Sequence, residues 1–171
     1  MTMAAAFVAV SMSAQVYVGG GLGFQSVSHD GDSESAFKIL PEIGYNLGED
    51  MAVGMAFGYG ETGKDERKIK VLTVNPYVRY NFVKLDKVNL FVDGGFDFTN
   101  TKYNSYKVNE WGIGLKPGVS VNLNENIGFV AHMGFLGYRS SKPDTDGAKA
   151  TNTVGLALDG TELSFGFYYN F

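Results

Sequence analysis

The sequence predicts an all-β protein, an eight-stranded antiparallel up-and-down β-barrel that spans a membrane and fills its lumen with side chains. Three observations predict this fold. Apolar and polar residues alternate through most of the chain, as in strands with two different faces. Longer polar segments alternate with short turns between the strands, which is the asymmetry of a transmembrane barrel. A motif Pro-x4-Asn-Leu/Phe recurs once per hairpin, at 41–47, 76–82 and 117–123.

The composition agrees with this fold. At 171 residues the chain is expected to form one domain, and its 23 glycines exceed the usual share of about 7%. No apolar run reaches the roughly 20 residues of a spanning helix. The mean hydropathy of -0.06 does not distinguish a soluble protein from a membrane barrel, because the apolar and polar faces of a barrel strand average out. The net charge of -4 argues against nucleic-acid binding, and the absence of cysteine excludes disulfides and thiol chemistry.

Residues 1–14 are small, apolar and uncharged, and the pattern changes abruptly at Gln15. This stretch predicts the remnant of a secretory signal peptide that is cleaved after Ala14. It departs from the usual signal in having no Lys or Arg before the apolar region. The alternative is a short membrane-seeking or core helix. We therefore expect a single transmembrane barrel domain over 15–171 in the mature protein.

The first three strands are expected at 16–26, 36–47 and 51–60. Each has one apolar face, and the opposite face holds small or polar residues; in the third strand that face is entirely glycine and alanine. Glycine normally weakens a strand, but the lumen of an eight-stranded barrel is so narrow that side chains fill it. We expect the small residues to face the lumen and to make room there for large side chains such as Tyr17 and Tyr77.

The next three strands are expected at 69–82, 88–99 and 109–123. Valine, leucine and aromatic residues dominate their apolar faces, whereas amides, glycines and charged residues share the other face. The prolines of the repeated motif point outward, and each removes a hydrogen bond from the ladder. We expect local bulges at these positions, which are Pro41, Pro76 and Pro117.

The last two strands are less regular. The seventh, 127–138, alternates weakly because Val130 and Leu136 fall on its polar face. The eighth, 154–171, changes parity between its two halves, and a bulge at 159–161 is predicted to restore the register. Alternatively, the first half of this strand belongs to a loop-side extension beyond the membrane.

The end of the chain carries an apolar face that runs to the last residue. This face consists of Leu163, Phe165, Phe167, Tyr169 and Phe171. Together with the segment Pro-Glu-Ile-Gly-Tyr-Asn-Leu at 41–47, it resembles the small OmpA/OmpX-type barrels of the outer membrane, the "porin family" of barrel proteins. The resemblance implies the outer membrane of a Gram-negative bacterium and four extracellular long loops. It also implies that the five residues are a barrel-insertion signal read by the assembly machinery, and that both mature termini are periplasmic.

Outward-facing aromatic residues gather at two levels. Tyr45, Tyr80 and Phe82 are expected near the short turns, and Tyr59 and Trp111 near the long loops. Two aromatic girdles are typical of a barrel with two water interfaces. The rival architecture is an aqueous lipocalin-like barrel, whose apolar face lines a ligand cavity. It would crowd about a dozen large aromatic side chains into one small cavity, and it is disfavoured for that reason.

The predicted lumen contains a network of charged residues and one histidine. Its members are Lys38, Glu42, Arg79, Asp93, Asp97, Glu110, Lys116, His132 and Glu162. Buried charges must be paired or neutralised. Arg79 and Asp93 lie at similar depth on adjacent strands, so we expect them to pair, with Glu42 and Lys116 extending the pair. The favoured interpretation is a plug of salt bridges; the alternative is a narrow pore, which the excess of anions would make cation-preferring.

No pattern indicates a catalytic, metal or cofactor site. His29 stands beside Asp30 and Asp32, a set that would in principle assist acyl transfer, but a solvated loop histidine is the simpler interpretation. The His-x-Ser of lipid deacylases is missing after His132. A weak Ca²⁺ site that includes Glu34 in the same acidic loop fits no calcium-loop spacing.

We therefore expect no enzymatic activity and no cofactor, and a structural or surface-interaction role. The expected partners are outer-membrane lipid and lipopolysaccharide, the barrel-assembly machinery during insertion, and a surface ligand at the longer loops. These loops are 28–35, 61–68, 100–107 and 139–152. The alternatives are the narrow pore for ions or small solutes and, more remotely, a lipid-modifying outer-membrane enzyme.

Overall fold

Every element in the described part of the chain is a β-strand. The computed structural model describes residues 15–29, 32–62, 68–103, 106–145, 147–157 and 163–171, and for 23–29, 32–36, 157 and 163 it describes the backbone alone. The strands are β1 (Val16–His29), β2 (Asp32–Asn46), β3 (Met51–Thr62), β4 (Ile69–Lys84), β5 (Val88–Lys102), β6 (Lys107–Asn122), β7 (Ile127–Met133), β8 (Phe135–Pro143), β9 (Thr151–Ala157) and β10 (Leu163–Asn170). In this part of the chain, no helix is long and apolar enough to cross a membrane.

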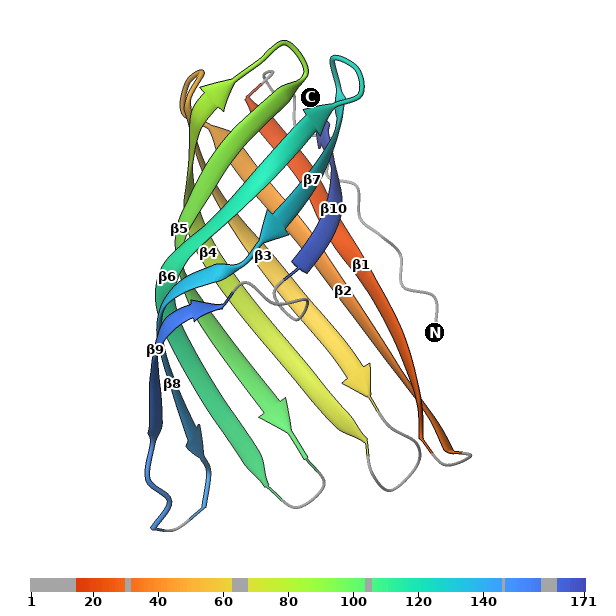
Figure 1. Ribbon diagram of the computed structural model, residues 1–171, viewed down its shortest axis with the longest axis vertical. Helices are drawn as coiled ribbons and strands as arrows, with labels where there is room; N and C mark the ends of the chain where they lie inside the picture. The colour runs from red at the N-terminus through yellow and green to blue at the C-terminus, as the bar shows by residue number, and fades with distance from the viewer. Residues whose placement is uncertain (1–14, 30–31, 63–67, 104–105, 146, 158–162) are drawn as a thin grey trace.

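Eight of these strands close into an antiparallel ring, which forms the barrel in Figure 1. Strands β1 to β7 pair with one another in chain order. β10 completes the ring by pairing with β7 on one side and with β1 on the other. The predicted eight-stranded antiparallel barrel is confirmed. Strands β1 to β6 contain 12 to 16 residues, more than the roughly 9–11 that a tilted strand needs to cross a bilayer.

The hairpin of β8 and β9 lies outside the ring, at the end of the barrel where the long loops are. β6 pairs with β8 up to Leu115 and with β7 from Gly118 onward. β7 and β8 therefore lie end to end along the same edge of β6. β9 pairs with β8 on the side away from β6. The prediction of a single strand at 127–138 is therefore wrong, since the segment is divided in two. For 154–171 the alternative holds, because its first half, β9, is a loop-side strand outside the ring.

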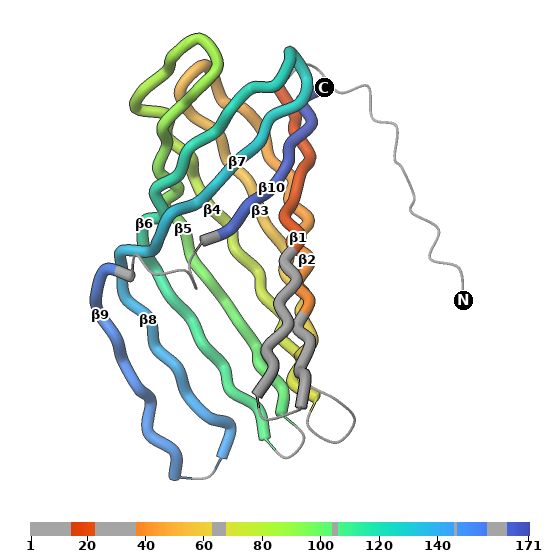
Figure 2. The backbone as a smooth tube through the Cα atoms, turned by 45° about the vertical axis from the view of Figure 1, so that its right-hand side comes forward, coloured from red at the N-terminus to blue at the C-terminus, as the bar shows by residue number. Residues whose placement is uncertain are grey.

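The pairing that closes the ring is short. Among the described residues, β1 pairs with β10 from Tyr17 to Gly21 and with β2 from Val16 to His29. In the half of the barrel near the long loops, Figures 1 and 2 show the β8–β9 hairpin standing apart from β1. Within the described ranges, no pairing joins β9 to β1. We call this side of the barrel the seam.

A β-bulge at Gly134 separates β7 from β8. Lys116 and Pro117 of β6 lie opposite the three residues 133–135, so one residue is inserted. Gly134 has a φ of 149°, a backbone angle that residues other than glycine rarely adopt. The inserted residue exchanges the two faces of the strand. Leu136 therefore lies on the apolar outer wall, and not on the polar face that strict alternation predicted for it.

The two parts of the predicted eighth strand also differ in register. Leu156 of β9 pairs with the outward-facing Leu136, and Phe165 of β10 pairs with Ala131 on the outer wall. Residues of opposite parity thus face outward on β9 and β10, which confirms the predicted change of register. The bulge predicted at 159–161 lies outside the described residues.

The bulges predicted at the prolines are wrong for Pro41 and Pro76. Beyond each of these prolines, pairing resumes in the register that precedes it. The missing N–H interrupts the ladder locally without inserting a residue. A register shift does occur in β4, but it falls between Asn81 and Val83. Of the three prolines, Pro117 is the one that lies opposite a bulge.

The strands extend into the predicted loops. β1 and β2 stay paired as far as His29 and Asp32, so most of the predicted loop 28–35 is strand. β8 runs to Pro143 and β9 begins at Thr151, which similarly shortens the predicted loop 139–152. The ladders continue past the length that a bilayer requires and project the loops away from it.

The outer wall of the barrel is apolar. Leu22, Ile113 and Phe167 expose 83%, 58% and 59% of their surface. Every strand of the ring exposes large apolar side chains of this kind, whereas soluble monomers rarely expose extended apolar patches. The predicted girdle residues are all exposed on the same wall: Tyr45, Tyr59, Tyr80, Phe82 and Trp111. Because a closed ring pairs its backbone groups internally, such a wall can face hydrocarbon.

Candidate functional site

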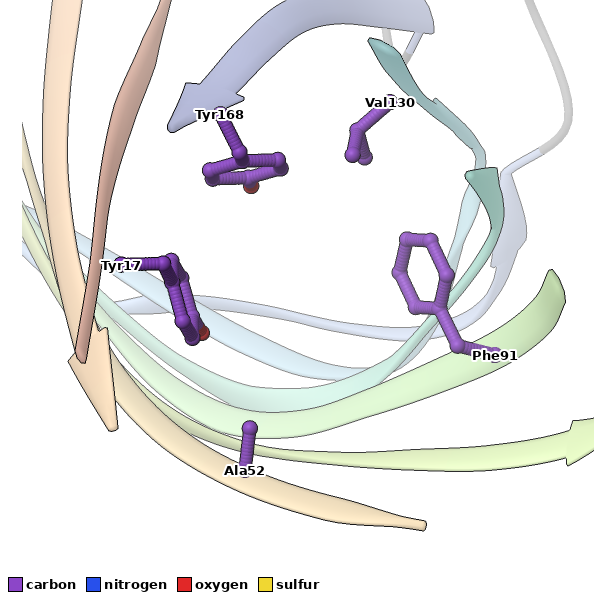
Figure 3. Packing of buried hydrophobic residues seen from close by; sticks show 5 residues of the cluster. All are labelled: Tyr17, Ala52, Phe91, Val130 and Tyr168. Carbon is purple, nitrogen blue, oxygen red and sulfur yellow. The ribbon is translucent and has the colours of Figure 1, made fainter. Parts of the chain in front are cut away.

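A cluster of inward-facing side chains fills the lumen in the half nearer the short turns. Figure 3 shows its five apolar members, which come from five strands. They are Tyr17 on β1, Ala52 on β3, Phe91 on β5, Val130 on β7 and Tyr168 on β10. Phe91 has no exposed surface. The lumen here is a packed core, as expected for a barrel of eight strands. We call this cluster and the charges within it the plug.

Arg79 and Asp93 form the ionic centre of the plug. The β4–β5 ladder places them directly opposite each other. Arg79 Nε donates to Asp93 Oδ1 at 2.7 Å, and Nη2 donates to Oδ2 at 2.8 Å. The guanidinium carbon also lies 4.1 Å from the centre of the Phe91 ring, in a cation–π contact. Both charges are therefore satisfied in a site where an unpaired charge would be costly.

Glu42 brings a second carboxylate to the same cation. Its Oε1 lies 3.8 Å from Arg79 Nη2 and accepts a hydrogen bond from the Tyr77 hydroxyl. Its Oε2 accepts a hydrogen bond of 2.6 Å from Tyr168. The hydroxyls of Tyr17 and Tyr77 are also hydrogen-bonded, at 2.6 Å. These contacts connect strands that are not neighbours in the sheet, so the plug crosslinks the barrel from inside.

Glycines on the facing strands leave the space that the rings of the plug occupy. A Cβ on Gly44 would overlap the ring of Tyr17, and a Cβ on Gly118 would overlap the ring of Phe91. Strands rarely carry so many glycines, because glycine has no side chain to pack. Here the absent side chain is what allows a large one to cross the lumen.

His132 extends the plug toward the long-loop end. Its Nε2 lies 2.8 Å from Asp93 Oδ2, and its Nδ1 lies 3.4 Å from the hydroxyl of Ser164. Hydroxyl, imidazole and carboxylate are the groups of an acyl-transfer triad. The hydroxyl–imidazole distance is long for a hydrogen bond of this kind, and Arg79 already neutralises Asp93. The arrangement therefore orients His132 more than it activates Ser164.

The remaining predicted lumen residues lie outside this centre. Lys116 is the neighbour of Asp93 in the ladder, yet its Nζ contacts Asp97 Oδ1 at 2.6 Å, so it does not extend the Arg79 pair as expected. Lys38 and Glu110 lie on inward-facing positions nearer the long loops. Glu162 lies outside the described residues.

Two residues of the site, Phe91 and Ser164, were not predicted from the sequence. The alternation of β5 did contain the information for Phe91, which shares its face with Asp93. It was overlooked because the inward face was expected to be polar or small. The contact of Ser164 with His132 depends on the pairing of β10 with β7, in which the two residues are direct partners.

Cavities lie on both sides of the plug. One of about 120 Å³ lies toward the short turns, and another of about 230 Å³ lies toward the long loops. Val130 and Tyr168 line both, so a thin layer of side chains separates them. The three asparagines of the repeated motif, Asn46, Asn81 and Asn122, line the first cavity together with Asn170, which holds the corresponding place near the end of β10. The repeat thus corresponds to a ring of amides at the short-turn end of the lumen.

Metal binding finds no support in the side chains that the structure describes, where no group of three potential ligands comes together. Of the acidic segment considered for Ca²⁺ or acyl transfer, Asp30 lies outside the described residues. For His29, Asp32 and Glu34, the backbone alone is described.

The fold, the apolar wall and the filled lumen define a small transmembrane β-barrel. Residues 1–171 match the family model described as "Outer membrane protein beta-barrel domain". The chain therefore belongs to this family, which makes it an outer-membrane protein of the kind found in Gram-negative bacteria. This agrees with the resemblance noted in the sequence.

Solved structures share the fold at low sequence identity. Neisserial surface protein A (NspA) is 18% identical, with a TM-score of 0.60 over 93% of this chain and 98% of that chain. The outer membrane protein OprG from Pseudomonas aeruginosa is 15% identical, with a TM-score of 0.54 over 92% of this chain and 96% of that chain. At such identities the likeness shows the fold alone. No curated protein matches the sequence.

Proposed function

We propose that this protein is a non-conducting outer-membrane barrel with a structural or surface-interaction role, exerted through its long loops. The observation that carries the proposal is the plug. Arg79 and Asp93 are 7% and 4% exposed and Phe91 is fully buried, which supports a lumen filled with side chains at this level. The outer wall is suited to lipid, which leaves the loop end as the surface for an aqueous partner. In this proposal the long loops are extracellular and both mature termini are periplasmic.

Single-channel conductance in a planar bilayer tests the proposal. The refolded chain is expected to be silent. Deleting the segment 145–150 between β8 and β9 is then expected to abolish binding to whole cells or matrix components that the intact protein binds, without affecting folding. Discrete openings of the unmodified protein would overturn the proposal.

The second candidate is a narrow cation-preferring pore. It is favoured by one observation, namely that water-sized space lies on both sides of the plug and that Val130 and Tyr168 line both cavities. Arg79→Ala would remove the ionic centre of this layer. If the pore interpretation is right, this variant opens frequently with a preference for cations, and the unmodified protein opens rarely.

Catalysis is not part of the proposal, and Ser164 allows a direct test. A fluorophosphonate probe labels serine hydroxyls that a neighbouring base activates. We expect no labelling of the refolded protein above a Ser164→Ala control, because the hydroxyl lies 3.4 Å from His132 and the imidazole is bound to a neutralised carboxylate. Stoichiometric labelling lost in the control would revive the lipid-modifying alternative.

A further inference from the structure

Three lysines form a row across adjacent strands at the long-loop end of the barrel. Lys70 of β4 lies directly opposite Lys102 of β5, which lies directly opposite Lys107 of β6. All three are exposed. Their positions in the alternation place them on the outward face, in line with Leu72, Phe98 and Trp111 of the apolar wall. We call these three residues the lysine row.

The lysine row is electrostatically unfavourable by itself. Directly opposite residues in a sheet hold their Cβ atoms about 5 Å apart, and like charges at that distance destabilise the pair. Lys102 has a lysine on both sides. Glu61 lies opposite Lys70 and attracts it, although its ion pair, at 3.1 Å, is with Lys68. Asp144 reaches the row through its backbone, as its N–H donates to the carbonyl of Lys107.

At the short-turn end of the same barrel, an exposed lysine has its charge neutralised by neighbouring carboxylates. Lys84 Nζ lies 2.6 Å from Asp50 and 3.4 Å from Glu49. In the described part of the chain, Lys102 and Lys107 have no carboxylate within the 4.0 Å of an ion pair. The row therefore presents positive charge that an external anion can neutralise.

The position of the row on the wall indicates which anion. On the side of the row that faces the middle of the barrel, the side-chain amides of Asn100 and Asn109 are hydrogen-bonded to each other at 2.6 Å. Phe98 and Trp111 form the next outward-facing pair in the same direction. Trp111 is also in ring contact with Tyr138 of β8, at 5.2 Å. Charge, amide and aromatic layers thus follow one another toward the apolar band. This is the sequence of environments from lipid headgroup to acyl chain.

We propose that Lys70, Lys102 and Lys107 bind the phosphate groups of lipopolysaccharide whose acyl chains pack on the wall formed by β4, β5 and β6. Lys142 of β8, which lies opposite Asn109, is exposed on the same face and supplies a fourth cation. The phosphates relieve the repulsion within the row, and the aromatic layer contacts the upper part of the acyl chains. The proposal rests on the extracellular orientation proposed above for the long loops.

The test compares Lys102→Gln/Lys107→Gln with Lys84→Gln/Lys87→Gln, which removes the same charge from the short-turn end. Each refolded full-length protein, in an uncharged detergent, is titrated with purified lipopolysaccharide and with the same material after removal of its phosphates. We expect each row lysine to contribute about fivefold, so that the first variant binds about 25-fold more weakly than the unmodified protein. The control variant is expected to bind like the unmodified protein, and the dephosphorylated lipid to bind all three weakly.

A second measurement separates binding from folding. In uncharged detergent without lipid, Lys102→Gln/Lys107→Gln is expected to have a higher unfolding midpoint than the unmodified protein, because the repulsion between the lysines is lost. With lipopolysaccharide present, the unmodified protein is expected to have the higher midpoint. Equal binding by the row variant and the control would overturn the proposal. So would equal binding of dephosphorylated lipid, or full competition by inorganic pyrophosphate or by phosphatidylglycerol vesicles. The orientation is checked independently by labelling loop lysines on intact cells: a periplasmic result overturns the orientation and leaves the measured affinity standing.

Discussion

Arg79 donates two hydrogen bonds to Asp93 across a single rung of the β4–β5 ladder, at 2.7 and 2.8 Å. The same guanidinium lies 3.8 Å from Glu42, so one cation accompanies two carboxylates inside the barrel. A buried pair gains little over an apolar pair of the same shape, but each partner is costly when left alone. Arg79 is therefore the residue on which the stability of the plug depends most.

Arg79→Met is expected to lower the free energy of unfolding by about 3–5 kcal/mol, because it leaves Asp93 and Glu42 buried without their cation. Urea unfolding of the barrel in lipid vesicles measures the change. The double variant Arg79→Met/Asp93→Asn removes one of the stranded charges and is expected to recover part of the loss. A single variant as stable as the unmodified protein would contradict this account of the plug.

Gly118→Ala is expected to destabilise the barrel by about 1–3 kcal/mol, since its Cβ would overlap the ring of the fully buried Phe91. The matched control is Gly155→Ala on β9, where a Cβ meets nothing within 4 Å. Urea unfolding of both variants separates steric overlap in the lumen from the general effect of adding a methyl group to a strand. Equal stabilities of the two variants would show that the ring of Phe91 moves freely.

Gly134→Ala tests the bulge between β7 and β8. Alanine at a φ of 149° is strained, so the variant is expected to lose about 1–3 kcal/mol of stability or to lose the inserted residue from the register. Gly128→Ala in β7 is the control, because its Cβ would make ordinary contacts at 3.6 Å and beyond. Amide hydrogen exchange across β8 distinguishes the two results: a slipped register changes protection throughout β8, and strain alone lowers it near the bulge.

Phe171→Ala tests the terminal face as a barrel-insertion signal. The ring is 39% exposed on the outer wall, and the backbone N–H donates to Val16 at 3.1 Å, a bond that the substitution keeps. We expect a large drop in the folded fraction recovered from cell membranes and little change in the stability of protein refolded in vitro. Leu123→Ala, an apolar truncation on the same wall at another short turn, is the control. A matching loss of folded protein in the control would assign the effect to lost apolar surface.

The ring of eight strands and its two faces could be predicted because the period of a strand is two residues and each face meets a different medium. The faces of β2, β3 and β6 illustrate this, since alternation in them is nearly unbroken. Alternation failed where a residue is inserted. Leu136 was assigned to the wrong face because one glycine, Gly134, shifts the register without any change in hydrophobicity.

The site was less accessible to sequence reasoning. Arg79 and Asp93 were expected to meet because a short turn joins their strands, which fixes the register between them. The contact of Lys116 with Asp97 depends on side-chain reach along the lumen axis, which ladder position alone does not specify. Phe91 was not predicted because its ring fits inside the lumen only in the space that Gly118 leaves. Gly118 lies on another strand, and the contact between the two cannot be read from the sequence near either residue.

The short pairing of β1 with β10 has a mechanical consequence. On its other side, β1 is held by a long ladder that runs from Val16 to His29 against β2. Along the seam, the described part of β10 pairs with β1 from Tyr17 to Gly21, and three of those five positions are glycine. Under tension this ladder is expected to separate before the long β1–β2 ladder does, which would open the cylinder into a sheet with β1 and β10 as its edges. Because β1 and β10 are the first and last strands of the ring in chain order, we expect their pairing to be the last to form when the barrel closes.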